Sequence, residues 1–165
     1  IFLATQARDN VPYYQHSYIG YNYRMSNIIA GIGRGQMKVL DNYINYRREN
    51  NLFYQKLFKN DEGINVFVEP SKSYFSNHWL STIIIDELKA GFTREDLRLQ
   101  LEKDKIESRP LWKPMHLQPI FQNCDYYGEK IAELLFDKGL CLPSGSNLTN
   151  EDRLRIKKSI KKLTK

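Results

Sequence analysis

The sequence predicts an α+β fold in which a small layered α/β domain packs against one long helix. Hydrophobic residues make up 41% and aromatic residues 13% of the 165 residues, which is enough apolar surface for the core of about one domain. A wide apolar stripe recurs at helical spacing from about residue 27 to residue 59. Two strand-like runs follow it, and helical and strand-like segments then alternate, an order typical of helices packed on a small sheet.

The long helix is expected to begin after Ser26, whose hydroxyl suits the N-cap position. Gly31, Gly33 and Gly35 lie inside the helix, where each glycine costs about 1 kcal/mol relative to alanine. We expect another helix or backbone segment to approach these glycines closely and to offset the loss. The alternative is a phosphate-binding glycine loop, although the three glycines follow a helix start and not a strand.

The other elements are recognised from β-branched runs, capping residues and prolines. Thr93 with Asp96, like Thr149 with Asp152, has the spacing of a capping box that opens a helix. Three prolines between residues 109 and 121 exclude a regular helix or a central strand there. The resulting expectation is strands at 64–68, 79–85 and 140–142, helices from Thr93, at 126–137 and from Thr149, and an extended piece at 106–108.

The formal net charge of +6 comes from the C-terminal residues 153–165, which hold seven basic and no acidic side chains. Residues 1–152 carry 18 basic and 19 acidic side chains and are therefore close to neutral. The tail has apolar residues at helical spacing, which favours a packed terminal helix with a solvated basic face. The alternative is a helix that binds nucleic acid, an anionic partner or a membrane surface.

Several classes of protein are excluded by what the sequence lacks. His16, His78 and His116 are too widely spaced to form a metal motif, so no metal ligand is expected. Cys124 and Cys141 form no CxxC pair, and reduced thiols in a cytoplasmic protein are the simplest expectation. No apolar stretch is long enough to span a membrane, and no signal peptide is recognisable.

Two irregular segments, residues 7–27 and 108–121, combine arginine, histidine and aromatic residues, and the first adds asparagines. Arginine forks and asparagine amides suit phosphate oxygens, and aromatic faces suit sugar or base rings. The two segments therefore indicate a site for a phosphorylated, ring-bearing ligand. The alternative is that both are aromatic packing loops.

These segments also carry a family resemblance. The motif LATQAR at 3–8 and the run YYQHSYIGYNYRMSNIIAGIGRGQMKVLD at 13–41 resemble the DegT/DnrJ/EryC1/StrS family of pyridoxal-phosphate sugar aminotransferases. The same holds for SRPLWKPMHLQPIF at 108–121 and AELLFDKGLCLPSGSNLT at 132–149. The chain is most similar to enzymes that aminate UDP-linked 4-keto-6-deoxy sugars on the route to bacillosamine-type sugars, for bacterial surface glycans or for protein glycosylation such as that of pilin.

The resemblance covers the C-terminal half of the family's sequence and implies a domain organisation. Residues 1–25 would be the end of the large domain of a fold-type-I aminotransferase, residues 26–60 a long connecting helix, and residues 61–165 the small C-terminal α/β domain. The family's catalytic lysine lies before the point where this chain begins, and Lys38, the first lysine here, is not in that context. Because the chain also starts at Ile1 without a methionine, we expect an inactive fragment of a longer enzyme.

The resemblance also implies roles for four residues. Asn22 matches the asparagine that reaches the cofactor phosphate of the partner subunit in a homodimer. Arg8 lies in the region where relatives place groups against the diphosphate of the substrate, and His116 matches a histidine near the nucleotide-sugar. Arg109 either shares that role or anchors its loop to a carboxylate. No catalytic residue and no metal ligand is assigned to this chain.

For the full enzyme, the resemblance implies transamination with pyridoxal phosphate as cofactor, in which glutamate donates an amino group to the C4 ketone of a nucleotide-linked sugar. A binding hypothesis stands beside it: a stand-alone basic domain that binds nucleic acid or an anionic partner through its C-terminal helix. A structural hypothesis is an interaction domain whose long helix dimerises. We expect a cytoplasmic protein that binds neither membranes nor nucleic acid.

Overall fold

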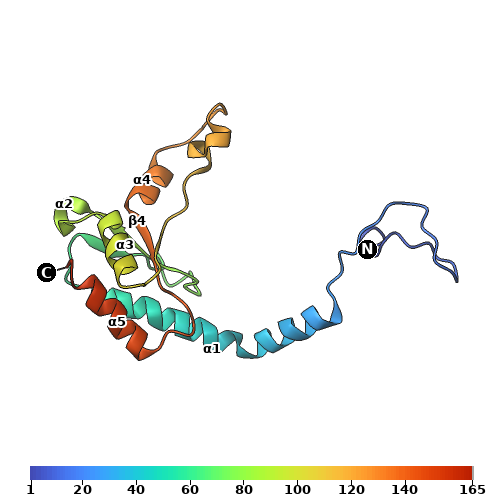
Figure 1. Cartoon of the computed structure of the whole chain (residues 1–165), viewed down its shortest axis with the longest axis horizontal. Helices are drawn as coiled ribbons and strands as arrows, with labels where there is room; N and C mark the ends of the chain where they lie inside the picture. The colour runs from blue at the N-terminus through green and yellow to red at the C-terminus, as the bar shows by residue number, and fades with distance from the viewer. Residues whose placement is uncertain (165) are drawn as a thin grey trace. The chain divides into compact units, whose positions relative to one another are not determined.

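A computed structural model describes residues 1–164 and divides the chain into two compact units, Ile1–Asp41 and Asn42–Lys165. Helix α1 (Asn27–Leu57) begins in the first unit and ends in the second. Figure 1 colours the elements in chain order. The long helix predicted for residues 27–59 is confirmed, and the backbone N–H of Ile29 donates to Ser26 Oγ over 3.3 Å at its start.

The three glycines of α1 do not meet the neighbour that was expected. Gly31, Gly33 and Gly35 are all helical, so the alternative of a phosphate-binding loop is wrong. A Cβ atom added at any of them would meet no atom within 4 Å in the first compact unit. The expectation of a close backbone approach is therefore wrong for this unit.

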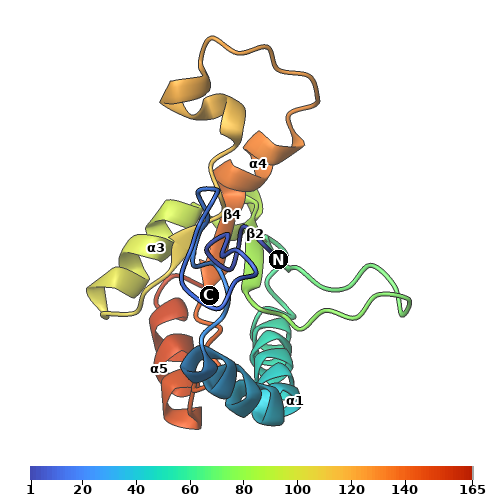
Figure 2. The same ribbon diagram turned by 90° about the vertical axis from the view of Figure 1, so that its right-hand side faces the viewer.

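The second unit contains an antiparallel sheet of four strands in the order β1-β2-β4-β3. Figure 2 labels its two central strands, β2 and β4. The strands are β1 (Ile64–Val66), β2 (Ser81–Ile85), β3 (Arg109–Pro110) and β4 (Gly139–Leu142). Strand β2 is shorter than predicted, since it begins at Ser81 and not at residue 79. The extended piece expected at 106–108 pairs instead at 109–110, where proline is tolerated because β3 is an edge strand.

The helices of the second unit follow their capping signals. They are α2 (Glu87–Ala90), α3 (Arg94–Lys103), α4 (Ile131–Lys138) and α5 (Asn150–Ile160). Both predicted capping boxes are present, at Thr93 before α3 and at Thr149 before α5. The sequence reading missed α2, whose N-cap Asp86 accepts from the backbone N–H of Leu88 over 3.2 Å.

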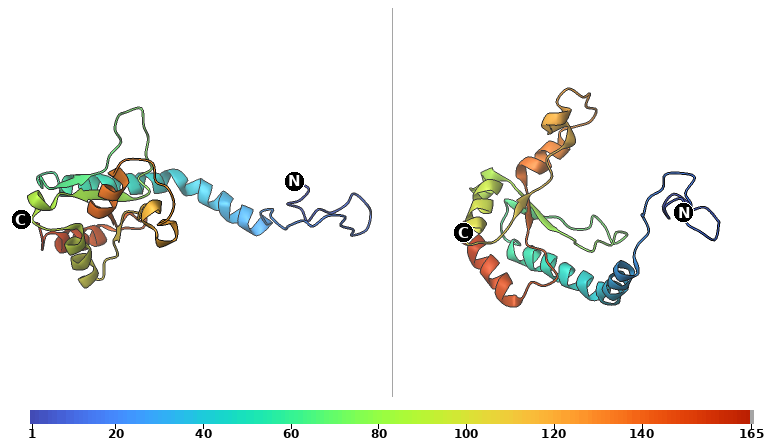
Figure 3. Two further views of the ribbon diagram at one scale, coloured as in Figure 1. Left: turned by 90° about the horizontal axis from the view of Figure 1, so that it is seen from above. Right: turned by 45° about the vertical axis from the view of Figure 1, so that its right-hand side comes forward.

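The predicted helix 126–137 begins later, at residue 131. Gly128, with φ +146°, has a backbone conformation that does not continue a helix. Between β3 and α4 the chain forms two 3₁₀ turns, Met115–Leu117 and Pro119–Phe121, and this excursion projects away from the sheet (Figure 3). The prolines thus have the predicted effect of preventing a regular α-helix in residues 109–121.

The core lies between one face of the sheet and the helices α3, α5 and the C-terminal part of α1. Helices α3 and α5 lie side by side (Figures 2 and 3). Alternate residues of β2 face the core, and Tyr54 of α1 donates from its hydroxyl to the Pro143 carbonyl oxygen over 2.8 Å. The buried core residues are Tyr54, Phe58, Ile64, Ile83, Ile85, Phe92, Leu97, Leu101, Ile106, Leu140, Leu142, Ile156 and Ile160. This arrangement of helices on one small sheet confirms the predicted α+β fold class.

Candidate functional site

The first irregular segment folds back on itself within the unit Ile1–Asp41. Thr5 and Asn22 form an antiparallel bridge, and the backbone N–H of Gln6 donates to the Tyr21 carbonyl oxygen over 3.0 Å. The crossing is tight, because a Cβ atom added at Gly20 would lie 2.3 Å from the backbone nitrogen of Ala7. Glycine at position 20 therefore allows the two backbone stretches to approach and fixes the position of Asn22.

The predicted residues Asn22 and Arg8 are both exposed in this unit. The guanidinium of Arg8 lies over the ring of Tyr14, 4.2 Å from its centroid. The Asn22 amide has no side-chain hydrogen bond among residues 1–164, so it is available to a ligand. A nearby carboxylate, Asp9, accepts from Ser17 Oγ over 2.7 Å and from Gln15 over 2.9 Å, and these bonds lower the pKa of Asp9.

The second irregular segment does not bring Arg109 and His116 into one pocket. The guanidinium of Arg109 contacts Glu107 Oε1, with its Nε at 2.7 Å. The His116 Nε2 lies 3.0 Å from Glu133 Oε1 of α4, and its ring stacks on Tyr126 at 3.7 Å between centroids. In this structure Arg109 has the loop-anchoring contact that was the alternative to substrate binding, and His116 ties its loop to α4.

A cleft of about 630 Å³ lies beside Arg109, between β3, the loop after β4 and the start of α5. Trp79 and Trp112 stand in its lining, with ring centroids 6.2 Å apart. Sequence reasoning did not single out this pair, because the two residues are far apart in the chain and Trp79 was assigned to a strand. The chain has only two tryptophans, and this rarity was the available signal that the two residues could belong to a site.

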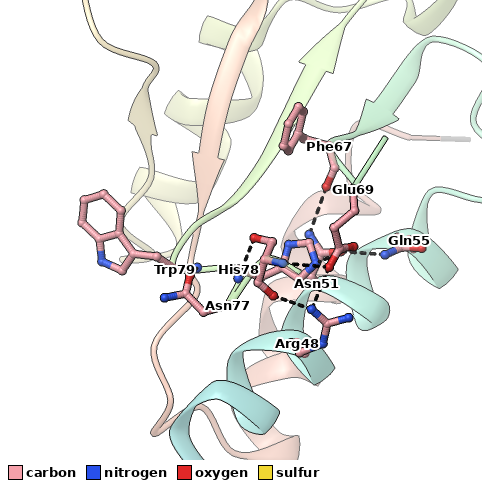
Figure 4. A network of polar contacts seen from close by, with 9 residues as sticks. Arg48, Asn51, Gln55, Phe67, Glu69, Asn77, His78 and Trp79 are labelled. Atoms are coloured by element: carbon pink, nitrogen blue, oxygen red, sulfur yellow. Dashed lines mark hydrogen bonds and ion pairs between the residues drawn. The ribbon is translucent and has the colours of Figure 1, made fainter. Parts of the chain in front are cut away.

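A polar network fastens the loop that precedes Trp79 to α1 (Figure 4). Glu69 accepts from Arg48 Nη1 over 2.7 Å and from the backbone N–H of Ser76 over 3.1 Å. His78, which is 5% exposed, places its Nε2 3.3 Å from the second Glu69 oxygen. The hydrogen bond from Arg48, followed by that from Ser76, lowers the pKa of Glu69 from 4.5 to about 2.

We expect this network to make stability depend on pH. The folded-state pKa of Glu69 lies below its unfolded value, so its contribution is present above pH 4.5 and is lost as the pH falls toward 2. Urea unfolding of Glu69→Gln should show a lower midpoint than wild type near neutral pH, and the difference should shrink below pH 4.5. The matched control is Glu62→Gln, since Glu62 is exposed and has no ion pair among residues 1–164. A difference that stays constant with pH would contradict this assignment.

The basic C-terminal helix is largely engaged within the second unit. Ile156 and Ile160 of α5 are buried, which confirms the predicted packed terminal helix. Arg153 donates to Asn50 over 3.0 Å and Lys162 pairs with Asp104 at 2.7 Å. Lys161 lies 3.7 Å from Asp61. Arg155 also donates to the backbone carbonyl oxygen of Asp104. Four of the six basic side chains in residues 153–164 thus have partners within the domain, which does not favour the hypothesis of nucleic-acid binding through this helix.

Residues 1–164 offer neither a metal site nor a membrane-spanning helix. They contain no group of three or more histidine, cysteine, aspartate or glutamate side chains able to hold a metal ion. None of the helices in the same residues has the length and hydropathy of a membrane span. Burial raises the pKa of the Cys141 thiol in β4, which disfavours the reactive thiolate.

Residues 3–161 match the model of a family described as the DegT/DnrJ/EryC1/StrS aminotransferase family. The chain is 41% identical to EpsN of Bacillus subtilis (strain 168), named as a pyridoxal phosphate-dependent aminotransferase, over 94% of this chain and 40% of EpsN. It is 37% identical to a GDP-perosamine synthase of Escherichia coli O157:H7, over 89% of this chain and 38% of that protein. The chain thus spans about two fifths of the length of these curated relatives.

Among solved structures, Helicobacter pylori PseC, an aminotransferase involved in the biosynthesis of pseudoaminic acid, has a TM-score of 0.81 to this chain at 22% identity. The match covers 99% of this chain and 44% of PseC. At this level of identity the likeness shows the fold, and it confirms that the small helix-and-sheet domain has an aminotransferase architecture.

Proposed function

This chain belongs to the DegT/DnrJ/EryC1/StrS aminotransferase family, and we propose that the full-length protein transfers an amino group to a keto group of a nucleotide-linked sugar. The observation that carries the proposal is the family match over residues 3–161, which confirms the resemblance read from the motifs. The names of the relatives support the substrate class, since GDP-perosamine synthase and dTDP-4-amino-4,6-dideoxy-D-glucose transaminase both refer to nucleotide-linked sugars.

The finer assignments are part of the proposal. The sugar is a UDP-linked 4-keto-6-deoxy sugar, glutamate is the amino donor, and the enzyme works as a homodimer in bacterial surface-glycan or protein glycosylation. The two free cysteines support a reducing, cytoplasmic location. Within the full-length protein, residues 1–25 end the large domain, residues 26–60 connect the domains and residues 61–165 form the small domain.

Pyridoxal phosphate is the cofactor that the family implies, and the residues of this chain fit one part of it. An exposed asparagine amide without another partner can donate to a phosphate oxygen without the cost of burying a charge, which suits Asn22. The family resemblance implies that the lysine that bonds to the cofactor lies in the part of the relatives that this chain does not span, and Lys38, the first lysine here, lies on α1. When bound, the cofactor supplies an electron sink for amino transfer. The residues of this chain would bind and orient it.

The test is to express the full-length protein and to measure the visible absorbance of bound pyridoxal phosphate. We expect this band in wild type and its loss on addition of glutamate, the proposed amino donor. Asn22→Ala should weaken cofactor retention by about 1.5–3 kcal/mol, the value of a hydrogen bond to a charged group. The 165-residue chain alone should show no transaminase activity.

The matched control is Asn10→Ala, because Asn10 is an exposed asparagine of the same unit. This variant should retain the cofactor as wild type does. A full-length protein that never acquires the visible band would contradict the proposed function. Equal cofactor retention in Asn22→Ala and wild type would contradict only the role of Asn22.

A further inference from the structure

The cleft beside β3 has the size and the lining of a small-molecule site. Its volume of about 630 Å³ lies within the range of 300–1,000 Å³ typical of ligand pockets. All of its lining residues belong to the unit Asn42–Lys165. Trp79 is 59% exposed and Trp112 is 66% exposed. Large exposed apolar surfaces rimmed by polar residues mark ligand-binding grooves or interaction sites.

Both indoles are held by ordered backbone. Arg47 donates to the carbonyl oxygen of Trp79 over 2.5 Å and to that of Ser144, across the cleft, over 3.2 Å. The backbone N–H of Trp79 donates to Asn77 Oδ1 over 3.0 Å. Figure 4 shows the indole of Trp79 directed away from the Glu69 network, which holds the preceding residue, His78. The tryptophan is thus presented by a fixed turn.

Trp112 is fixed in a similar way by the edge strand. It follows β3, and the backbone N–H of Leu111 donates to the Gly139 carbonyl oxygen over 3.2 Å. The two rings are tilted by 35° with centroids 6.2 Å apart. A planar ring inserted between them would need about 7 Å, twice the contact distance of carbon atoms. A ligand ring that stacked on this pair would therefore lie on an open outer face and not between the two indoles.

The polar groups of the cleft suit a phosphorylated ligand. Ser108 Oγ is buried in the lining without a hydrogen-bond partner among residues 1–164. Lys105 lines the same cleft and has no ion pair within the described residues, whereas Arg109 is paired with Glu107. These groups correspond to the parts of a nucleotide. The indole surface suits the base, the unpartnered Ser108 hydroxyl suits the ribose or the base edge, and the unpaired Lys105 cation suits the phosphates.

We propose that Trp79 and Trp112 form the stacking surface for the base of the nucleoside diphosphate in the substrate. This inference rests on the proposed function and adds to it the place where the nucleotide is recognised. The sugar ring and the cofactor are not involved in this contact, so the pair is a binding determinant and not a catalytic group. The alternative occupant of the indole surface is protein from the part of the relatives that this chain does not span.

The test measures nucleotide affinity in the full-length protein, by calorimetry with UDP, GDP and dTDP as separate probes. We expect Trp79→Ala and Trp112→Ala each to raise the Kd for the nucleoside diphosphate that wild type prefers by about tenfold, the loss of one base–aromatic stack. The Kd for inorganic diphosphate should be unchanged, because that probe has no base. Trp112→Phe, which keeps an aromatic ring, should retain most of the wild-type affinity for the nucleoside diphosphate.

The matched control is Tyr127→Ala, which removes an aromatic ring that is 88% exposed and lies outside the cleft. It should bind nucleotide as wild type does. Unchanged nucleotide affinity in both alanine variants, or a lower thermal midpoint without a change in affinity, would overturn the stacking site and leave the proposed function standing. A wild-type protein that binds cofactor and none of the three nucleotides would overturn both the stacking site and the substrate class. The visible absorbance of the bound cofactor distinguishes these outcomes from a protein that does not bind pyridoxal phosphate at all.

Discussion

Leu140→Ala should lower the free energy of unfolding by about 2–5 kcal/mol, the range for a buried leucine truncated in a packed core. Leu140 is fully buried in β4, where it pairs with Ile83 of the central strand β2 and with Pro110 of the edge strand β3. The shortened side chain leaves a cavity, and the neighbouring strands β2 and β3 cannot move in to fill it. Urea unfolding followed by circular dichroism measures the change.

The matched control is Leu154→Ala, since Leu154 is 57% exposed on α5. It should change the free energy of unfolding by less than about 0.5 kcal/mol. Because β3 carries Arg109 and forms one wall of the tryptophan cleft, Leu140→Ala should also weaken nucleotide binding. Equal stability of the two alanine variants would contradict the position of β4 at the centre of the core.

Gly139→Ala should destabilise the protein by about 1–3 kcal/mol, the usual effect of overpacking a filled interior. The glycine is buried at the start of β4, directly after α4. A Cβ atom there would lie 2.3 Å from the Leu135 carbonyl oxygen and 2.2 Å from Cδ1 of Leu111. The leucine side chain can rotate away, but the carbonyl oxygen of α4 moves only if the helix shifts.

Gly31→Ala is the contrasting control, because the same substitution in the interior of α1 meets open space within its own unit. It should raise the stability of the 165-residue chain by up to about 1 kcal/mol through helix propensity alone. Thermal unfolding of the two variants should therefore move the midpoint in opposite directions. A higher midpoint for Gly139→Ala would contradict the close approach of α4 and β4.

Local signals account for most of the fold that was predicted. The capping boxes at Thr93 and Thr149 and the β-branched run of β2 specify their elements within a few residues of sequence. Where the prediction was wrong, either the local signal was too short to be recognised or the deciding contact came from a distant part of the chain. Helix α2 is a single turn between Asp86 and Gly91, too short for a periodic pattern, and the extended piece moved to 109–110 because it pairs with β4.

For the candidate site, too, the sequence predicted one part and missed another. The residue types of the two irregular segments indicated a phosphorylated, ring-bearing ligand, and their motifs led to the family. The roles of Arg8, Asn22, Arg109 and His116 stay predictions, since the contacts that Arg109 and His116 make in this structure are with Glu107 and Glu133. The contact of Trp79 with Trp112 was missed, because the rarity of tryptophan marks both residues but no local pattern shows that they meet.

The sequence by itself determined the family, the α+β class, the long helix and the neutral body with a basic terminal helix. These depend on periodicity, capping and motif spacing, which act over a few residues at a time. Only the tertiary structure decided which distant residues meet. The order β1-β2-β4-β3 places the last strand between the second and the third, and so brings residues 79, 112 and 144 around one cleft. Such contacts are set by the packing of whole strands and helices, a global property that no local stretch of sequence contains.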